Sequence, residues 1–585
     1  MSRQRLWAML AVALLFAMYL SRIGGFVLQD PDEGRYAEIP REMIETGDWV
    51  TPKLFYVKYF EKPPLLYWLT AISFEVFGLS EWSARLVPAL SGLATIFLTF
   101  LLGVRLCGRR AAWIGCGVLA TMPLFFALSQ ALLIDVLLTA CMSATMLGVY
   151  AAHTADDKRR WALLVAFSVA LGVLAKGLVA LVLPGGIALA FLLWRRDFPT
   201  MRALLHWQAL LLFLVVAVPW FVVVSLRNPE FLEFFFVREH FQRFMATGAA
   251  KVGHPEGPFY YIPVVLLGPA PWTLVALLLA ASAAGRRAFA AIPGDARLLL
   301  LLWSGIVVGF FSMSTSKLGS YILPALPAIG LLFGAWIDRA IEEEESLSLA
   351  IVRVLRGVFV LLGGALAVAA LVAWPLHERL AGWIGRDVVD VMVVAGAASS
   401  VALGLLAAAF VSARLRFEER GRPAAAIGLL VAGMALVLVL AIDGRAVTKT
   451  ARALAEAINP YRQQGDLIVS YKRMMQSLGF YTRQRIVQFD AYHEIEAGAL
   501  IAPDHDEYFW KDMDRLAREW ASGRRVFIAT DEKHVPFLDE HLVPAPRVLV
   551  QDHRRVVLVN FPATAHGSVE AAAAHEPVQP TLPDG

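Results

Sequence analysis

The chain has 585 residues, of which 58% are hydrophobic and only 17% are charged. Soluble globular proteins carry about 25% charged residues, so this composition excludes a soluble protein and indicates a polytopic membrane protein. The net charge of +4 is too small to suggest a nucleic-acid partner.

Apolar runs of about 17–25 residues predict membrane-spanning helices, and the sequence contains thirteen of them. The predicted spans are 6–28, 83–104, 111–129, 132–151, 161–175, 177–194, 207–226, 259–281, 298–314, 320–337, 351–374, 389–412 and 422–442. The first span is interpreted as a retained anchor rather than a signal peptide, because its apolar part is long and no small-residue cleavage site follows it before Asp30.

Basic residues indicate how these spans are oriented. Arg and Lys gather at the N-terminus and on alternate connections, such as 105–110 and 158–160. Excess positive charge marks the cytoplasmic side. We therefore expect the N-terminus inside, and the loops 29–82 and 227–258 and everything after 443 outside.

Three parts follow from this organisation: a transmembrane domain at 1–443, an outer α/β domain at 444–563 and a disordered tail at 564–585. In the outer domain, short apolar runs alternate with helix-compatible segments. The predicted strands are 466–471, 485–489, 525–530 and a hairpin at 547–558, and the predicted helices are 474–481 and 508–521.

The first outer loop is patterned for two short helices lying on the membrane surface. Asp30 is predicted to cap the first helix, with Pro31 at its first position, Glu33 three residues after the cap, and Gly47 at its end. After two prolines, residues 65–77 are again compatible with a helix.

On a helix beginning at Pro31, the side chains of Asp32, Arg35 and Tyr36 share one face. An acid, a guanidinium and a phenol side by side suit a polar substrate, and the alternative is a structural ion pair between Asp32 and Arg35. Before the second helix stand Tyr59, Glu61 and Lys62. Interfacial anchoring is the alternative for the Tyr and the Lys, but it does not explain the Glu.

Three further positions carry charge at the outer ends of spans. Asp135 lies at the start of the fourth span, where a carboxylate is costly unless it is paired or functional. Lys176 lies between the fifth and sixth spans, with a snorkelling lysine as the alternative. In the loop after the seventh span, His240 is able to share a divalent metal with Glu61, or is simply a hydrogen-bonded histidine.

Arg243 in that loop and Tyr321 in the turn 314–324 complete the set. All these groups are predicted to converge on the outer leaflet. Arg binds phosphate bidentately and Lys binds it as a point charge. The residues therefore predict a lipid-phosphate site beside carboxylates.

Six motifs resemble one family, in order along most of the first 330 residues. They are PDEGRYAE at 31–38, GDW at 47–49, YFEKP at 59–63, AKG at 175–177, EHFQRF at 239–244 and KLGSYILP at 317–324. The chain resembles the bacterial 4-amino-4-deoxy-L-arabinose lipid A transferases. These belong with the protein O-mannosyltransferases among glycosyltransferases of the GT-C fold. Departures are Gly34, where the family often has Thr, and Gly319 and Ser320, which replace a common Pro and Thr.

The resemblance implies an α-helical polytopic membrane protein of the GT-C type in the bacterial inner membrane, with periplasmic juxtamembrane helices and a small periplasmic α/β domain. It also implies roles for individual residues. Asp32 and Asp135 match the catalytic carboxylates, and Glu61 with His240 matches a pair able to hold a divalent metal. Donor and lipid-phosphate binding is implied for Arg35, Tyr36, Tyr59, Lys62, Lys176, Arg243 and Tyr321.

The expected reaction is a direct, inverting displacement at the anomeric carbon of an undecaprenyl-phosphate sugar, with lipid A as the acceptor. Asp32 is the natural base for a hydroxyl acceptor, and it orients the donor if the acceptor is an anionic phosphate. One alternative is transfer of another sugar to a glycan, lipid or protein. A lipid-linked sugar transporter is the alternative from another class, although transporters concentrate charge near the midplane, whereas this chain places it in outer loops.

Overall fold

The computed structural model describes residues 3–242, 256–343, most of 346–358, 449–492 and 495–562, with isolated positions between 360 and 404. The chain divides into two compact units. The membrane unit comprises Met1–Phe26, Asp48–Pro52 and Phe60–Ala446, and the C-terminal unit comprises Val27–Gly47, Lys53–Tyr59 and Val447–Gly585. Most of the first outer loop up to Tyr59 therefore folds with the C-terminal segment, a grouping that the predicted boundaries 1–443 and 444–563 do not include.

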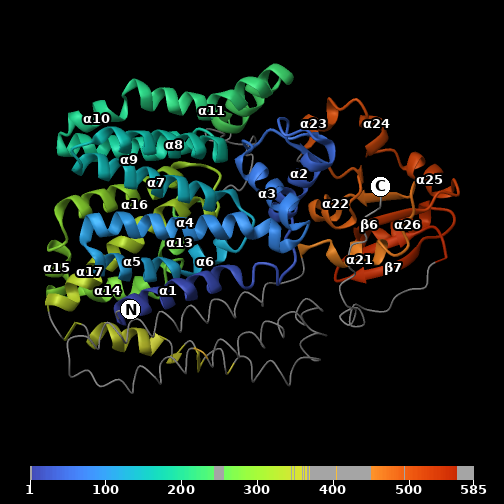
Figure 1. Cartoon of the computed structure of the whole chain (residues 1–585). Helices are drawn as coiled ribbons and strands as arrows, with labels where there is room; N and C mark the ends of the chain where they lie inside the picture. The colour runs from blue at the N-terminus through green and yellow to red at the C-terminus, as the bar shows by residue number, and fades with distance from the viewer. Residues whose placement is uncertain are drawn as a thin grey trace. The chain divides into compact units, whose positions relative to one another are not determined.

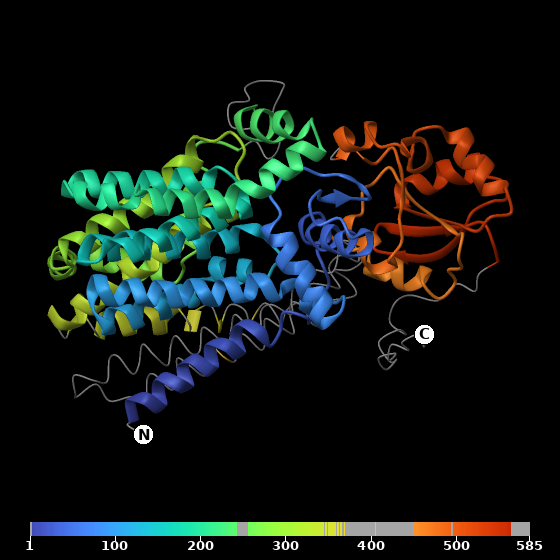
Figure 2. The same cartoon turned by 45° about the horizontal axis from the view of Figure 1, so that its top comes forward.

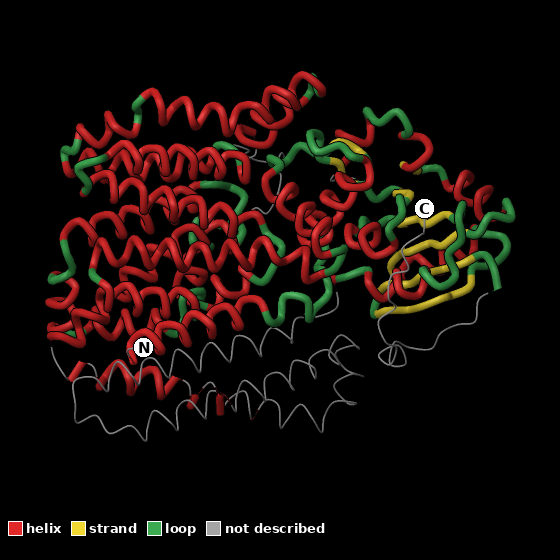
Figure 3. Tube along the Cα trace, viewed as in Figure 1, coloured by secondary structure: helices red, strands yellow, loops and turns green. Residues whose placement is uncertain are grey.

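The described part of the membrane unit is helical, and its long helices lie side by side with their axes roughly aligned (Figure 1; Figure 3). Its elements are α1 (Arg3–Leu20), α3 (Leu65–Phe77), α4 (Glu81–Cys107), α5 (Arg109–Ala120), α6 (Pro123–Ser129), α7 (Ile134–Thr154), α8 (Lys158–Lys176), α9 (Val179–Arg195), α10 (Phe198–Leu204), α11 (Trp207–Arg227), η1 (Glu233–Gln242), α13 (Tyr261–Leu267), α14 (Trp272–Ala281), α15 (Ala283–Ala290), α16 (Gly294–Met313), η3 (Gly319–Ala325) and α17 (Leu326–Glu343).

Among the described residues, five helical segments are long and apolar enough to cross a membrane, or seven if each of two bent pairs forms one span. The five segments agree with the spans predicted at 83–104, 132–151, 207–226, 298–314 and 320–337. The predicted spans 389–412 and 422–442 lie almost wholly outside the described residues, and 351–374 lies partly outside them, so the total of thirteen stays a prediction.

Two predicted spans are not straight helices. The span predicted at 111–129 is α5 followed by α6, bent by 67°, and the span predicted at 259–281 is α13 followed by α14, bent by 94°. Proline explains both breaks, because it cannot donate the backbone hydrogen bond that continues a helix. Pro123 begins α6 after an extended Met122, and Pro269 and Pro271 separate α13 from α14.

The C-terminal unit contains a six-stranded sheet in the order β5-β4-β3-β6-β8-β7. β3, β4, β5 and β6 are parallel, whereas β8 pairs antiparallel with both β6 and β7. Helices lie on both sides of the sheet (Figure 2). The elements are β3 (Leu467–Tyr471), β4 (Val487–Phe489), β5 (Phe509–Trp510), β6 (Val526–Asp531), β7 (Arg547–Asp552), β8 (Arg555–Val559), α21 (Arg452–Ile458), α22 (Gln476–Thr482), α23 (Glu496–Leu500), α24 (His505–Tyr508), α25 (Met513–Ala521), η8 (Glu532–His534) and α26 (Val535–His541).

Most of this α/β pattern agrees with the prediction: β3, β4, β6, α22 and the β7–β8 hairpin lie where the sequence places them. The helix predicted at 508–521 is wrong in its first part. Phe509 and Trp510 instead form β5, paired with Gln488 and Phe489 of β4. α25 begins only at Met513, because the Asp512 side chain accepts a hydrogen bond from the Asp514 N–H and caps the helix there.

The first loop contributes α2 (Asp32–Thr46) and the small hairpin of β1 (Lys53–Leu54) and β2 (Val57–Lys58) to the C-terminal unit. α2 ends at Gly47, which has a φ of 67°, and α3 spans the predicted residues 65–77. Ile39 and Met43 are buried on one face of α2, as their spacing predicts. α2 packs against α22, so its buried face belongs to the unit's interior.

The predicted cap of α2 is wrong. The Asp30 side chain does not bond to the first turn of α2, whose N-cap is Pro31. The Asp30 carboxylate instead accepts hydrogen bonds from the backbone N–H of Ser477 at 2.7 Å and from its hydroxyl at 2.9 Å. Glu33 accepts from the Gln29 N–H at 3.0 Å. The Asp30 carboxylate binds at Ser477 because the first N–H groups of α22 have no hydrogen-bond acceptor within their own helix.

Candidate functional site

Four predicted site residues meet in the C-terminal unit. Arg35 Nη1 donates a hydrogen bond to the Tyr59 hydroxyl at 3.0 Å, and Arg35 Nη2 lies 3.6 Å from Asp32 Oδ1. The guanidinium carbon lies 5.8 Å from the ring centroids of both Tyr36 and Tyr59. We call Asp32, Arg35, Tyr36 and Tyr59 the loop cluster.

Local structure explains how the loop cluster forms. Spacings of three and four residues place Asp32, Arg35 and Tyr36 on one face of α2. The β1–β2 hairpin, with Leu54 opposite Val57, turns the chain back so that Tyr59 reaches the same face.

Exposure distinguishes the roles within the loop cluster. The Arg35 side chain is 12% exposed, whereas the Asp32 side chain is 48% exposed. A separation of 3.6 Å makes the Asp32–Arg35 contact a loose ion pair rather than a hydrogen bond. Arg35 is anchored by Tyr59, so Asp32 keeps acceptor oxygens for a ligand. This geometry favours the substrate-binding interpretation of Asp32 over the purely structural one.

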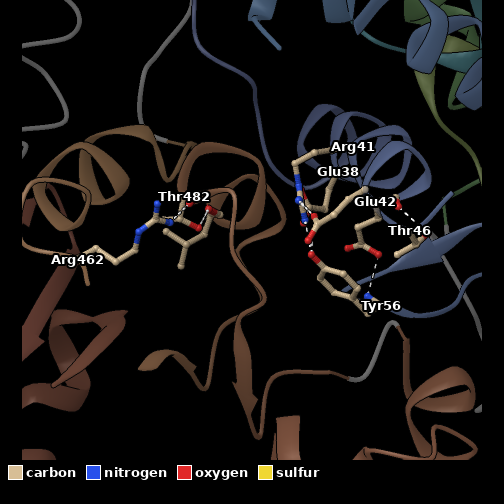
Figure 4. Close-up of polar contacts among 9 residues, drawn as sticks. Glu38, Arg41, Glu42, Thr46, Tyr56, Arg462 and Thr482 are labelled. Atoms are coloured by element: carbon tan, nitrogen blue, oxygen red, sulfur yellow. Dashed lines mark hydrogen bonds and ion pairs between the residues drawn. The ribbon is translucent and has the colours of Figure 1, made fainter. Parts of the chain in front are cut away.

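The buried face of α2 carries a polar network that we did not predict (Figure 4). Arg41 donates to both carboxylate oxygens of Glu38 at 2.7 and 2.8 Å, reaches the Tyr56 hydroxyl at 3.3 Å and also pairs with Glu45. Glu42 accepts the Tyr56 N–H at 2.8 Å. Burial, reinforced by the neighbouring Glu38, raises the pKa of Glu42 well above its usual range. The spacing of Glu38, Arg41 and Glu45 on a helix is the signal that could have revealed this network.

Three other predicted residues meet in the membrane unit. Asp135 stands in the first turn of α7, Lys176 is the last residue of α8, and their side chains form an ion pair. The Lys176 ammonium lies 4.6 Å from the ring centroid of Tyr321 in η3. The Asp135 and Lys176 side chains are 7% and 11% exposed. We call Asp135, Lys176 and Tyr321 the membrane cluster.

Each charge of the membrane cluster suits the helix end that carries it. An acid is stabilised at a helix N-terminus and a cation at a helix C-terminus. Pairing also removes the cost of an isolated carboxylate in a span. Lys176 therefore contacts a carboxylate and an aromatic ring, and the snorkelling interpretation does not describe its position. Lys317, in the same turn as Tyr321, is buried and donates to the backbone carbonyls of Ser314 and Glu256, so it stabilises the turn.

Glu61 and Lys62 lie in the membrane unit, in the segment that leads into α3. The Lys62 ammonium donates to the Glu61 carbonyl at 3.0 Å. The preceding Phe60 packs edge-on against Phe231 and Phe234, with ring centroids 5.3 and 6.3 Å away. These aromatic contacts connect the Glu61–Lys62 segment to η1 and to the residues just before it.

The remaining two predicted residues, His240 and Arg243, lie partly or wholly outside the described residues. His240 belongs to η1, but its side chain is outside the described residues, and so is all of Arg243. Among the described residues, no group of three His, Cys, Asp or Glu side chains could hold a metal ion. The Glu61–His240 metal pair stays a prediction, and so does the convergence of all these residues on one site.

Comparisons with known proteins extend over both units. Residues 5–235 match the family model of dolichyl-phosphate-mannose-protein mannosyltransferase, and residues 454–560 match that of the aminoarabinose transferase C-terminal domain. The undecaprenyl phosphate-alpha-4-amino-4-deoxy-L-arabinose arabinosyl transferase of Aeromonas salmonicida is 30% identical over 94% of this chain and 98% of that protein. Its namesake in Shewanella sediminis is 34% identical, over 59% of this chain and 62% of that protein, which is less than two thirds of its length.

A solved structure agrees with these matches. The crystal structure of ArnT from Cupriavidus metallidurans bound to undecaprenyl phosphate superposes with a TM-score of 0.82 at 28% identity, covering 96% of this chain and 99% of that one. The family resemblance read from the six motifs is thus confirmed. This chain is a membrane protein of the GT-C fold and belongs to the undecaprenyl phosphate-aminoarabinose arabinosyl transferase family.

Proposed function

We propose that this protein transfers 4-amino-4-deoxy-L-arabinose from undecaprenyl phosphate to lipid A at the periplasmic face of the bacterial inner membrane. One observation carries the proposal. The chain aligns over 94% of its length with a transferase named for this donor, and it shares a fold with ArnT bound to undecaprenyl phosphate. The two clusters then supply groups suited to the two ends of such a donor.

The loop cluster suits the sugar. An exposed carboxylate, Asp32, stands beside a guanidinium that Tyr59 holds in place. Asp32 accepts a hydrogen bond from a sugar hydroxyl or pairs with the positively charged amine of aminoarabinose. With a lipid A phosphate as the acceptor, no strong base is needed because the attacking oxygen is already anionic. With a hydroxyl acceptor, Asp32 removes the proton.

The membrane cluster suits the lipid phosphate. Lys176 supplies a positive charge, Tyr321 supplies a phenolic donor, and Asp135 holds the ammonium in place. An incoming phosphodiester competes with Asp135 for Lys176. Lys62 and Arg243 are the further cations that we propose for this phosphate.

The proposed step is a single displacement. An oxygen of the acceptor forms a bond to the anomeric carbon while the bond from that carbon to the donor's phosphate oxygen breaks, which inverts the anomeric configuration. Undecaprenyl phosphate leaves with one more negative charge than it carried in the donor. Fixed cations aimed at developing charge lower the barrier most when their positions need no rearrangement, and this is the role we assign to Lys62, Lys176 and Arg243.

Glu61 and His240 are the residues that we propose for a divalent metal. A carboxylate and an imidazole are a donor set that zinc and similar ions accept. Bound there, the ion would add positive charge near the donor phosphate. The metal content of purified wild-type protein and of Glu61→Ala and His240→Ala variants, measured by mass spectrometry, tests this assignment without any assay of transfer.

Mass spectrometry of lipid A from cells with and without the gene tests the proposed function. We expect lipid A carrying aminoarabinose only when the gene is present. Unchanged lipid A, together with a change in another glycolipid or glycan, would contradict the proposal and support transfer of a different sugar.

A further inference from the structure

The part of the C-terminal unit from Val447 onward, here called the C-terminal domain, contains the six-stranded sheet. This domain has an edge of the kind at which α/β domains usually bind ligands. β3 is followed by α22 and then by its neighbour β4, whereas β6 pairs with the other side of β3. After β3 the chain continues to β4 on one side, and after β6 it continues to β7 and β8 on the other side. The connections from these two adjacent parallel strands therefore run in opposite directions across the sheet. Crevices at the carboxyl ends of such strands are the usual binding places in open α/β sheets. Ser477, in the first turn of α22, lies just beyond this end of β3.

In this protein a carboxylate of the first outer loop occupies that place. Asp30 accepts both hydrogen bonds from Ser477, and the Asp30 N–H donates to the Lys449 carbonyl at 2.6 Å. The Ser477 hydroxyl also accepts the Ala451 N–H at 3.0 Å. Burial raises the pKa of the Asp30 carboxyl, and the hydrogen bonds from Ser477 and the positive charges of Arg555 and Arg473 partly offset that rise. These hydrogen bonds join Asp30, two residues before α2, to the segment 449–451 and to the start of α22.

Two glycines let α2 and α22 approach closely. A Cβ on Gly34 would lie 2.6 Å from the Ser477 nitrogen, and a Cβ on Gly479 would lie 2.9 Å from the carboxyl carbon of Glu38. Glu38 is fully buried and paired with Arg41 at 2.7 Å, so it has little freedom to move aside. The glycine at position 34 thus has a local reason, since this approach leaves no room for a side chain.

From these contacts we infer that the C-terminal domain holds the site helix α2 in position and that Asp30 is the main positioning residue. Asp30 precedes Asp32 by two residues, so a shift of Asp30 is passed to Asp32 within one helical turn. This inference rests on the proposed function for its kinetic part. Its structural part concerns only the C-terminal unit.

The kinetic test uses Asp30→Ala, Asp30→Asn and Gly479→Ala in the full-length protein in membranes. Displacing a reacting group by about 1 Å can cost about 100-fold in rate. We expect Asp30→Ala to lower kcat at least tenfold with little change in the donor KM, the pattern of a lost transition-state interaction. Asp30→Asn keeps an oxygen for the Ser477 N–H, so it should retain more activity. Gly479→Ala removes no functional group and should lower kcat in the same way.

Asp466→Asn is the matched control. Like Asp30, Asp466 accepts a backbone N–H, from Gln463 at 2.7 Å. It is buried and precedes β3, at the opposite end of that strand. The substitution Asp466→Asn makes the same chemical change as Asp30→Asn, in the same domain but away from α2. Its kcat should stay within about twofold of the wild type, as expected for a group without contact to the site.

Hydrogen exchange of residues 31–47 in the purified full-length protein supplies a measurement that does not depend on transfer. We expect faster exchange of this segment in Asp30→Ala and in the milder Ser477→Ala, and unchanged exchange in Asp466→Asn. Unchanged exchange and kcat in Asp30→Ala would overturn the inference, as would an equal loss in Asp466→Asn. If wild-type protein transfers no sugar, the proposed function fails, and the exchange result still decides whether the domain holds α2.

Discussion

The ion pair between Asp135 and Lys176 allows stability and activity to be separated. Their side chains are 7% and 11% exposed, so solvent screens the pair little. Removing one partner of a buried ion pair destabilises a protein, because the remaining charge is no longer compensated. Replacing both partners by apolar residues of similar size is often nearly neutral for stability. Lys176→Met, Asp135→Leu and the double variant therefore test what the pair contributes.

We expect Lys176→Met to lower the free energy of unfolding by about 3 kcal/mol, because an uncompensated carboxylate in a membrane costs about that much. Asp135→Leu should cost less, about 2 kcal/mol, since Lys176 keeps its contact with the Tyr321 ring. The double variant replaces the pair itself at little cost, but it also loses the contact between the Lys176 ammonium and the Tyr321 ring, so it should cost about 2 kcal/mol. That is less than the sum of about 5 kcal/mol for the single variants and corresponds to a coupling of about 3 kcal/mol.

Unfolding by SDS in mixed micelles measures these differences, and a transfer assay on the same preparations measures activity. We expect all three variants to lack transfer, including the double variant with its partly restored stability. Two results would contradict these expectations. Additive losses of stability would mean that the pair is not coupled, and recovery of transfer in the double variant would make the pair purely structural.

Three further predictions concern Asp32 and Tyr59 of the loop cluster and Asp30, the proposed positioning residue. Asp32→Asn should abolish transfer while leaving the unfolding midpoint unchanged; wild-type transfer by this variant would remove Asp32 from the mechanism. Tyr59→Phe removes a hydrogen bond to the Arg35 guanidinium, so kcat/KM should fall about tenfold, the equivalent of about 1.5 kcal/mol; an unchanged kcat/KM would show that Arg35 needs no anchor. Burial raises the pKa of Asp30 to about 6, so the folded state binds this proton more tightly than the unfolded state. The free energy of unfolding of the wild type, relative to that of Asp30→Asn, should therefore fall as the pH rises from 4 to 6. The fall should be at most about 3 kcal/mol, because the Asp30 side chain keeps some exposure to solvent. A pH-independent difference in thermal stability would contradict that assignment.

Local pattern was sufficient to predict several parts of the fold. The end of α2 at Gly47, α3 after its two prolines, and the strands β3, β4 and β6 all follow from short-range signals. The breaks between α5 and α6 and between α13 and α14 do not follow from apolar character alone, because an apolar run shows where a span lies and only its prolines indicate a bend.

Contacts between distant residues were beyond such reasoning. Asp30 has every local feature of a helix cap, yet its partner Ser477 lies 447 residues away. The grouping of α2 with the C-terminal domain depends on that contact and on close packing at Gly34 and Gly479. By contrast, the pairing of Asp135 with Lys176 could be anticipated, since a carboxylate in a span needs a partner.

Transfer by the purified protein tests the central claim most directly. Wild-type protein in lipid vesicles would receive undecaprenyl-phosphate aminoarabinose and lipid A, with Asp32→Asn as the matched control. We expect lipid A to gain aminoarabinose with inverted anomeric configuration and undecaprenyl phosphate to accumulate, and we expect neither change with Asp32→Asn. Intact donor after incubation with folded wild-type protein, or equal transfer by both proteins, would contradict it.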